Sequence, residues 1–142
     1  MKTTIMIFSM VSIFCQVHAQ KLMEKDVPQA VAMAFKKEHP SIKEVDWKKE
    51  AGNYEAEFEE NKMELAAKYT VSGKLIETQM EITVSTLPAP ALEYLKNNYK
   101  GEKIEEASKI TAANGIVMYE AEVKGMDVIF DSKGNFMKTL DY

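Results

Sequence analysis

Apolar residues recur at helical spacing in two segments of this chain, and the segments that follow them alternate between apolar and polar positions. The helical segments are Val27–Pro40 and Leu87–Lys100, and each begins with an apolar residue followed by proline. Proline is tolerated at the first helical position because its missing N–H would be unpaired there anyway. The pattern therefore predicts one helix in each segment, ended by Pro40 in the first and by Gly101 in the second.

Four short alternating runs follow each predicted helix. Turns that contain Gly or Asn separate most of these runs, which is typical of antiparallel hairpins. The stretches YTVSGKLIET and FDSKGNFMKT, one from each copy, align without a gap. The runs are IKEVDWKKE, YEAEFEE, MELAAKYTV and KLIETQMEI in the first copy, and KIEEASKIT, IVMYEAEV, MDVIFD and FMKTLDY in the second.

This duplication predicts the fold class. We expect an α+β protein of two tandem α-β4 repeats, residues 20–84 and 85–142, preceded by the N-terminal segment 1–19. A module of about 60 residues buries only a modest fraction of its surface and is marginally stable alone. The two copies are therefore expected to share one antiparallel sheet with the helices on one face.

A duplicated Tyr-Glu-Ala-Glu stretch predicts how the strands are oriented. It occurs at Tyr54–Glu57 and again at Tyr119–Glu122. Because alternate side chains of a strand share a face, Tyr and Ala point one way and the two glutamates the other. The apolar face must meet the helices, which carry the only other apolar stripes. The acidic face is then open to solvent.

The open face is the candidate binding surface. Its charged residues surround a few apolar ones, which fits either a plain solvated surface or a docking surface, since scattered exposed apolar residues are normal. Glu64, Asp127 and Ile116 are also expected on this face. The candidate partner-binding residues are Glu55, Glu57, Lys68, Met118, Glu120, Glu122 and Ile129.

The paired glutamates raise the question of catalysis. Glu55 and Glu57 are two residues apart on one strand, so their Cα atoms lie roughly 6–7 Å apart, a separation compatible with a general acid and base. A catalytic pair also needs a pocket that drives the two pKa values apart, and the sequence indicates none. We favour a solvated strand face, and predict no catalytic residues and no enzymatic activity.

Metal and cofactor chemistry has little support in the sequence. Beyond the N-terminal segment the chain has one histidine, His39, at a predicted helix end where the helix dipole favours it as a cap. No cysteine–histidine cluster, Gly-x-Ser-x-Gly motif or glycine-rich phosphate loop occurs. We therefore predict no cofactor and no metal ligands. Trp47 is in phase with Val45 and is expected in the core.

The N-terminal segment has the features of a secretory signal peptide. Lys2 precedes an apolar run at 5–17, and the next residues lead to a small-residue cleavage pattern ending at Ala19. The run is too short to span a membrane. Cleavage there would remove Cys15, the only cysteine, so no disulfide is expected. We expect a periplasmic or secreted protein with no membrane span after cleavage.

Charge narrows the classes of partner. The formal net charge is −4, and every basic residue is a lysine. Arginine is the usual bidentate reader of phosphate and guanine, and an acidic chain is repelled by polyanions. Nucleic acids and anionic membrane surfaces are therefore not expected as partners.

The ordered pattern resembles a known family. The signal, the two helix-plus-four-strand repeats, the Tyr-Glu-Ala-Glu second strands and the SGK or KGN hairpin before each last strand are similar to the PepSY-like proteins of Bacteroidetes, also described as β-lactamase-inhibitor-like. The resemblance covers Lys21–Tyr142. It implies a fold like the β-lactamase inhibitory protein, with helices on one side and a concave sheet on the other, and an exported location. No residue here matches the inhibitory loops of that protein, so lactamase inhibition is not carried over.

These observations predict an exported, non-enzymatic binding module. It would engage an envelope protein or peptide through the open sheet face, in an inhibitory or regulatory role. The alternative is a cell-envelope protein that binds a small ligand or a metal ion. Such a ligand would raise the melting temperature, because a molecule that binds only the folded state stabilises it.

Overall fold

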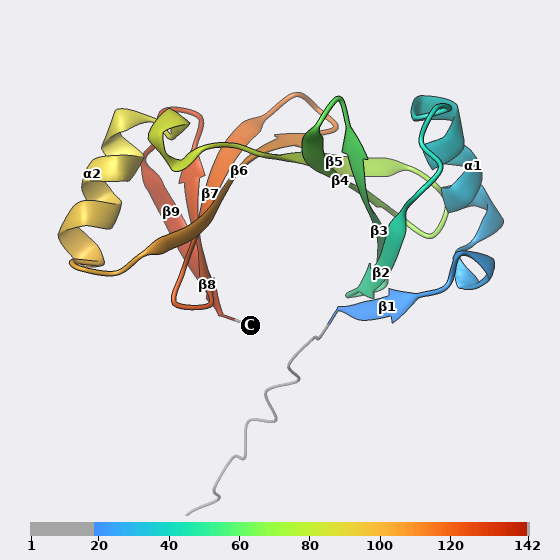
Figure 1. Ribbon diagram of the computed structural model, residues 1–142, viewed down its shortest axis with the longest axis horizontal. Coiled ribbons are helices and arrows are strands. Elements are labelled where there is room, and N and C mark those ends of the chain that lie inside the picture. Colours follow the sequence, from blue (N-terminus) through green and yellow to red (C-terminus); the bar gives the residue numbers. More distant parts are fainter. Residues whose placement is uncertain (1–18, 142) are drawn as a thin grey trace, which may run out of the picture.

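One continuous antiparallel sheet forms the centre of this protein. The computed structural model describes residues 19–141, so the predicted signal peptide up to His18, with Cys15, and the final Tyr142 lie outside the described residues. Within the described range, nine strands follow one another in the sheet in chain order, from β1 to β9. Two α-helices flank them (Figure 1). The predicted α+β class and tandem arrangement are confirmed.

Each repeat contains a short 3-10 turn, an α-helix and four strands. The first repeat comprises η1 (Glu24–Asp26), α1 (Gln29–Glu38), β2 (Asp46–Glu50), β3 (Asn53–Glu60), β4 (Met63–Tyr69) and β5 (Leu75–Glu81). The second comprises η2 (Val84–Thr86), α2 (Ala89–Asn98), β6 (Ile104–Ala112), β7 (Val117–Val123), β8 (Met126–Asp131) and β9 (Phe136–Asp141).

A further strand, β1 (Gln20–Leu22), precedes the first repeat and pairs antiparallel with β2. The sequence analysis did not predict it. Three residues are too few to show an alternating pattern, so only the pairing with β2 identifies this segment as a strand.

The two repeats are joined through strand pairing. Residues 77–81 of β5 pair antiparallel with residues 108–112 of β6. The last strand of the first repeat therefore hydrogen-bonds to the first strand of the second, and the predicted sharing of one sheet is confirmed. The boundary between the repeats at 84 and 85 stays a prediction, because the sheet runs through both without a break.

Both helices begin directly after a proline. Pro28 and Pro88 occupy the N-cap positions, with φ of −54° in each case. The carbonyl of Pro28 accepts hydrogen bonds from the N–H groups of Val31 and Ala32, at 2.9 and 3.1 Å. The prediction that these prolines take the first helical position is thus wrong by one residue. Their carbonyls begin the helix, and their lack of an N–H is of no consequence there.

A glycine in the last hairpin of each repeat lets that hairpin approach the helix. Gly73 and Gly134 have φ of +79° and +86°, a region that favours glycine. A Cβ on Gly134 would lie 2.7 Å from Cβ of Pro88, and a Cβ on Gly73 would clash with the carbonyl oxygen of Ala30. The aligned stretches of the two copies therefore share this glycine because each hairpin packs against the start of its own helix.

Two hydrophobic cores lie between the helices and the sheet. In the first, Phe35 of α1 packs edge-to-face on Trp47 and Phe58, with ring centroids 5.5 and 5.0 Å apart. Trp47 is thus in the core, as predicted. The buried residues of the first core are Val27, Val31, Phe35, Trp47, Tyr54, Ala56, Phe58, Ala67 and Tyr69. Those of the second are Leu87, Ala91, Leu95, Ala107, Ala121, Val123, Val128 and Phe130.

The sheet arches between the two helices, which lie at its outer ends (Figure 1). Each helix covers the outer face of its own repeat. Accordingly, the first core contains side chains from α1 and the second contains side chains from α2. The inner face of the arch carries no helix among the described residues. This inner, concave face is the one that presents the glutamates of both Tyr-Glu-Ala-Glu stretches.

Candidate binding face

The concave face is defined by the strand register. Alternate residues of neighbouring strands lie opposite one another, so the glutamates of β3 and β7 identify the other members of the face. Its principal residues are Lys48, Glu50, Glu55, Glu57, Lys68, Glu77, Gln79, Ser108, Ile110, Met118, Glu120, Glu122, Asp127, Ile129 and Lys138.

In the first repeat, Lys68 lies among three carboxylates. Its Nζ is 3.4 Å from Oε1 of Glu77, 3.6 Å from Oε2 of Glu55 and 3.7 Å from Oε2 of Glu50. Burial lowers the pKa of Lys68, but the three carboxylates outweigh burial and the net effect raises it. Lys68 therefore stays charged at neutral pH and neutralises part of this acidic cluster.

A second lysine neutralises the other candidate glutamate of this repeat. Lys48 on β2 forms an ion pair with Glu57, and it also lies directly opposite Glu55 in the register. Burial lowers the pKa of Lys48, but the hydrogen bond to Glu57 and the charges of Glu57, Glu55 and Asp46 together outweigh burial and raise it. Burial raises the pKa of Glu55, and the charge of Lys68 opposes that rise. The glutamates of the first repeat thus have their cations within the chain.

In the second repeat, Glu120 has a different setting. Its Oε1 accepts a hydrogen bond of 2.9 Å from Nε2 of Gln79, on β5 of the first repeat. Within residues 19–141, no lysine forms an ion pair with it. Burial raises the pKa of Glu120 to about 7, and repulsion from Asp127 adds to the rise. Glu120 is therefore divided between its neutral and charged forms near neutral pH.

The apolar members of the second repeat are less open than expected. Ile129 was predicted on a solvent-open face, and it lies on that face, but it is only 4% exposed. Ile110 and Asp127 on the same face are also buried, whereas Met118 is half-buried. The concave curvature draws neighbouring side chains together, so the flanking residues cover Ile129. A role in binding for the seven candidate residues stays a prediction.

Glu122 follows Glu120 two residues later on the same face of β7. It lies opposite Glu106 on β6 and Asp127 on β8. Burial and the charges of Glu105, Glu106 and Asp127 raise the pKa of Glu122. The structure therefore groups the candidates into two clusters. Glu55, Glu57 and Lys68 lie in the first repeat, and Met118, Glu120, Glu122 and Ile129 lie in the second.

The junction of the repeats supplies residues that the sequence analysis missed. Gln79 and Glu77, both on β5, contact Glu120 and Lys68, which belong to different repeats. Neither was a candidate, because the pairing of β5 with β6 cannot be read from alternation alone. Ser108, also missed, lies directly opposite Glu120 and is 7% exposed.

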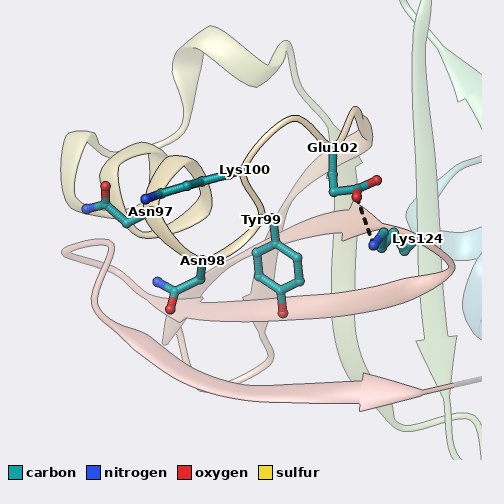
Figure 2. Close-up of a pocket in the computed structure, with 6 residues that line it drawn as sticks. All are labelled: Asn97, Asn98, Tyr99, Lys100, Glu102 and Lys124. Atoms are coloured by element: carbon teal, nitrogen blue, oxygen red, sulfur yellow. Dashed lines mark ion pairs between the residues drawn. The ribbon is translucent and has the colours of Figure 1, made fainter.

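Two surface hollows occur in the described part of the molecule, and only the larger one touches the concave face, through Glu57. One of about 370 Å³ lies at the end of α2, where Tyr99 and Asn98 point along different directions and Glu102 is bound by Lys124 at 2.8 Å (Figure 2). Its lining is polar and does not converge on one point. The other, a groove of about 1410 Å³, runs beside α1 and is lined by Met33, Phe35 and residues 40–47 among others.

No group of three or more His, Cys, Asp or Glu residues within 19–141 is arranged to hold a metal ion. His39 caps α1 and contacts Glu60, with Nδ1 3.6 Å from the carboxylate. None of the helices in the described part of the chain has the length and apolar character needed to cross a membrane.

The comparison with protein families gives a clear result. A family described as beta-lactamase-inhibitor-like and PepSY-like matches the chain twice, at residues 13–77 and 67–138. This chain therefore belongs to the beta-lactamase-inhibitor-like, PepSY-like family, as the sequence resemblance indicated, and contains two of its repeats. The two matches overlap, so they do not set the boundary between the repeats. No curated protein matches the chain significantly.

Solved structures share this fold at low sequence identity. A protein from Bacteroides eggerthii described as periplasmic has a TM-score of 0.69 and 17% identity, over 80% of this chain and 87% of its own. A DUF2874 family protein from Bacteroides uniformis has a TM-score of 0.68 and 18% identity, over 79% and 87%. A BLIP-like protein from Bacteroides fragilis has a TM-score of 0.60 and 18% identity, over 80% and 84%. These likenesses establish the fold.

Proposed function

We propose that this protein is an exported, non-enzymatic binding module that engages an envelope protein or peptide through its concave face. The observation that carries the proposal is the one-sided covering of the sheet: both helices pack on the outer face, and the inner face keeps half-buried charged side chains beside Met118. Likeness to proteins described as periplasmic and as BLIP-like supports an exported binding role.

The state of the carboxylates favours binding over catalysis. Glu55 and Glu57 are held by Lys68 and Lys48, so they do not form a free acid and base pair. Glu120 has the raised pKa of a potential acid, but the hollows described above lie elsewhere, at the end of α2 and beside α1. Glu120 lines neither hollow, and a carboxyl group with a raised pKa in that setting is better suited to respond to a charged partner than to perform a reaction.

Site-specific photocrosslinking in the native cell envelope tests the proposal. A photoreactive residue replaces Glu122 on the concave face in one variant and Met33, which is 64% exposed on α1, in the control variant. We expect Glu122 to yield a defined adduct that Met33 does not, and the identified partner, once purified, to bind the wild-type protein in solution. Equal adducts from both positions, or a partner crosslinked from Met33 alone, would contradict the concave face as the binding surface.

A further inference from the structure

The two repeats differ at one corresponding place on the concave face. In the first repeat, the residue opposite Glu55 on the following strand is Lys68, which forms an ion pair with it. In the second repeat, the residue opposite Glu120 on the following strand is Ile129. The first repeat therefore supplies its own cation to this glutamate. The second repeat has an aliphatic side chain at the position that corresponds to Lys68.

The preceding strands differ in the same sense. Lys48 lies opposite Glu55, whereas Ser108 lies opposite Glu120. Both lysines that flank the first glutamate are thus replaced by uncharged residues beside the second. The carboxylate itself is retained, although burying a carboxylate without a cation is costly. Retention of the carboxyl group with loss of both flanking lysines points to a cation supplied from outside the chain.

The surroundings of Glu120 have the character that a long cationic side chain requires. Met118 is half-buried and provides accessible apolar surface beside Glu120, whereas Ile129, Ile110 and Asp127, which adjoin these residues on the same face, are buried. Lysine and arginine lay their aliphatic stems along apolar surface while the charged end reaches a polar group. We refer to these five residues, with Gln79, as the Glu120 subsite.

We propose that the Glu120 subsite binds a lysine or arginine side chain of the partner, in the position that Lys68 takes beside Glu55. This inference rests on the proposed function and names the chemistry of the occupant: a basic segment of a protein or peptide. The charge of the whole face is complementary to such a segment. Of the principal concave residues, Glu50, Glu55, Glu57, Glu77, Glu120, Glu122 and Asp127 are acidic, whereas Lys48, Lys68 and Lys138 are basic.

The raised pKa of Glu120 is consistent with a cationic occupant. Its pKa of about 7 reflects burial first and the charge of Asp127 second, with opposing contributions from Gln79 and Lys68 and a small addition from Glu77. A partner cation would favour the charged carboxylate and so lower the pKa. Binding of a basic segment should therefore release a proton near neutral pH and be tighter at pH 8 than at pH 6.

The test uses pentalysine as the probe and NMR of the full mature chain as the measurement, with the side-chain carboxyl signals followed by carbon detection. We expect pentalysine to move the Glu120 signal and to lower its pKa. Glu120→Gln should weaken binding by about tenfold, the loss of roughly one charge-assisted contact. Glu93→Gln is the matched control, since Glu93 is an exposed glutamate on α2, and it should change affinity by less than about twofold because it removes the same charge away from the concave face.

A second variant supplies the cation from within. Ile129→Lys reproduces the arrangement of the first repeat and should lower the pKa of Glu120 and weaken pentalysine binding as much as Glu120→Gln does. Backbone amide shifts of the helix residues show whether each variant retains its fold. If Ile129→Lys disturbs the fold, the comparison of Glu120→Gln with Glu93→Gln still decides the outcome. The proposal would be overturned if those two variants weakened pentalysine binding equally. It would also be overturned if pentalysine moved only the NMR signals of residues on α1 and α2.

The proposed function and the subsite fail in different ways. Position-specific crosslinking from Glu122 together with no response of Glu120 to pentalysine would retain the concave face and refute the cationic occupant. Absence of both the crosslink from Glu122 and the response of Glu120 to pentalysine would also refute the concave face as the binding surface. Pentaglutamate serves as the control for charge, and a comparable response to it would also refute the subsite.

Discussion

The two repeats place the same glutamate in opposite electrostatic surroundings. Glu55 lies between two lysines of its own repeat, and Glu120 lies beside Ser108 and Ile129. The backbone around them is equivalent, since each glutamate is the second residue of a Tyr-Glu-Ala-Glu strand. The comparison shows that duplication reproduces the strand and its faces, whereas substitution on the neighbouring strands changes the charges that surround the retained glutamate.

The largest expected effect concerns whether the repeats unfold together. Phe130 in the second core is fully buried, so Phe130→Ala should lower the free energy of unfolding by about 3–5 kcal/mol. Trp47 lies in the first core, and its fluorescence reports on the first repeat. Because one sheet joins the repeats, we expect the Trp47 transition in urea to shift with the circular-dichroism transition. Ile116→Ala, at a residue 57% exposed, is the control. An unchanged Trp47 transition would mean that the repeats unfold independently.

The next effect separates backbone strain from contact with the helix. Gly134 and Gly115 have nearly the same φ, +86° and +87°, but only Gly134 lies against a helix. Gly134→Ala should cost about 2–4 kcal/mol, from strain of roughly 1–2 kcal/mol plus the clash with Pro88. Gly115→Ala should cost only the strain. The difference in melting temperature between the two variants measures the packing of the last hairpin against α2. No difference would show that the hairpin yields freely.

Removal of the internal cation should make the first repeat resemble the second. Lys68→Ile leaves Glu50, Glu55 and Glu77 without their shared lysine, and should lower the free energy of unfolding at pH 8 by about 1–3 kcal/mol. Lys21→Ile is the control, since its ion pair with Asp46 is well exposed and is expected to contribute less than about 1 kcal/mol. The same variant should raise the pKa of Glu55, measured by carboxyl NMR. A pKa of Glu55 that does not rise would separate its titration from Lys68.

The smallest effect is a pH dependence of stability that distinguishes the two glutamates. The pKa of Glu120 is raised from 4.5 to about 7 in the folded protein, so the folded state binds more protons than the unfolded state between these values. Its contribution to stability is therefore greatest at low pH and falls as the pH rises from 4.5 through 7.

The fall between pH 5 and pH 8 should amount to on the order of 2 kcal/mol, from about 1.4 kcal/mol per pKa unit. Denaturant unfolding at the two pH values measures it. Glu120→Gln should remove this dependence, and Glu55→Gln should remove less of it, because the charge of Lys68 opposes the rise in the pKa of Glu55. Equal pH dependence in wild type and Glu120→Gln would assign the titration to other groups.

Much of the fold could be predicted from local pattern. Alternation in Tyr54–Glu57 and Tyr119–Glu122 gave the correct faces, because a strand's side chains alternate whatever its neighbours are. The helices and all four strands of each repeat were also predicted. β1 was not, since a three-residue strand depends on its pairing with β2 for its existence.

The candidate site could be predicted only in part, because its properties depend on neighbours from distant segments. Glu120 was identified from its strand, but its partner Gln79 is 41 residues away in the sequence. The burial of Ile129 likewise follows from the curvature of the sheet, which alternation does not specify.

The sequence by itself determined the tandem repeat and which side chains share a face, since these follow from short-range periodicity. The tertiary structure decided which carboxylates have a cation. Lys68 reaches Glu50, Glu55 and Glu77 because three strands meet beside it, and Glu120 has no such lysine among the described residues. Electrostatic settings depend on distances across strands, and only the folded sheet fixes those distances.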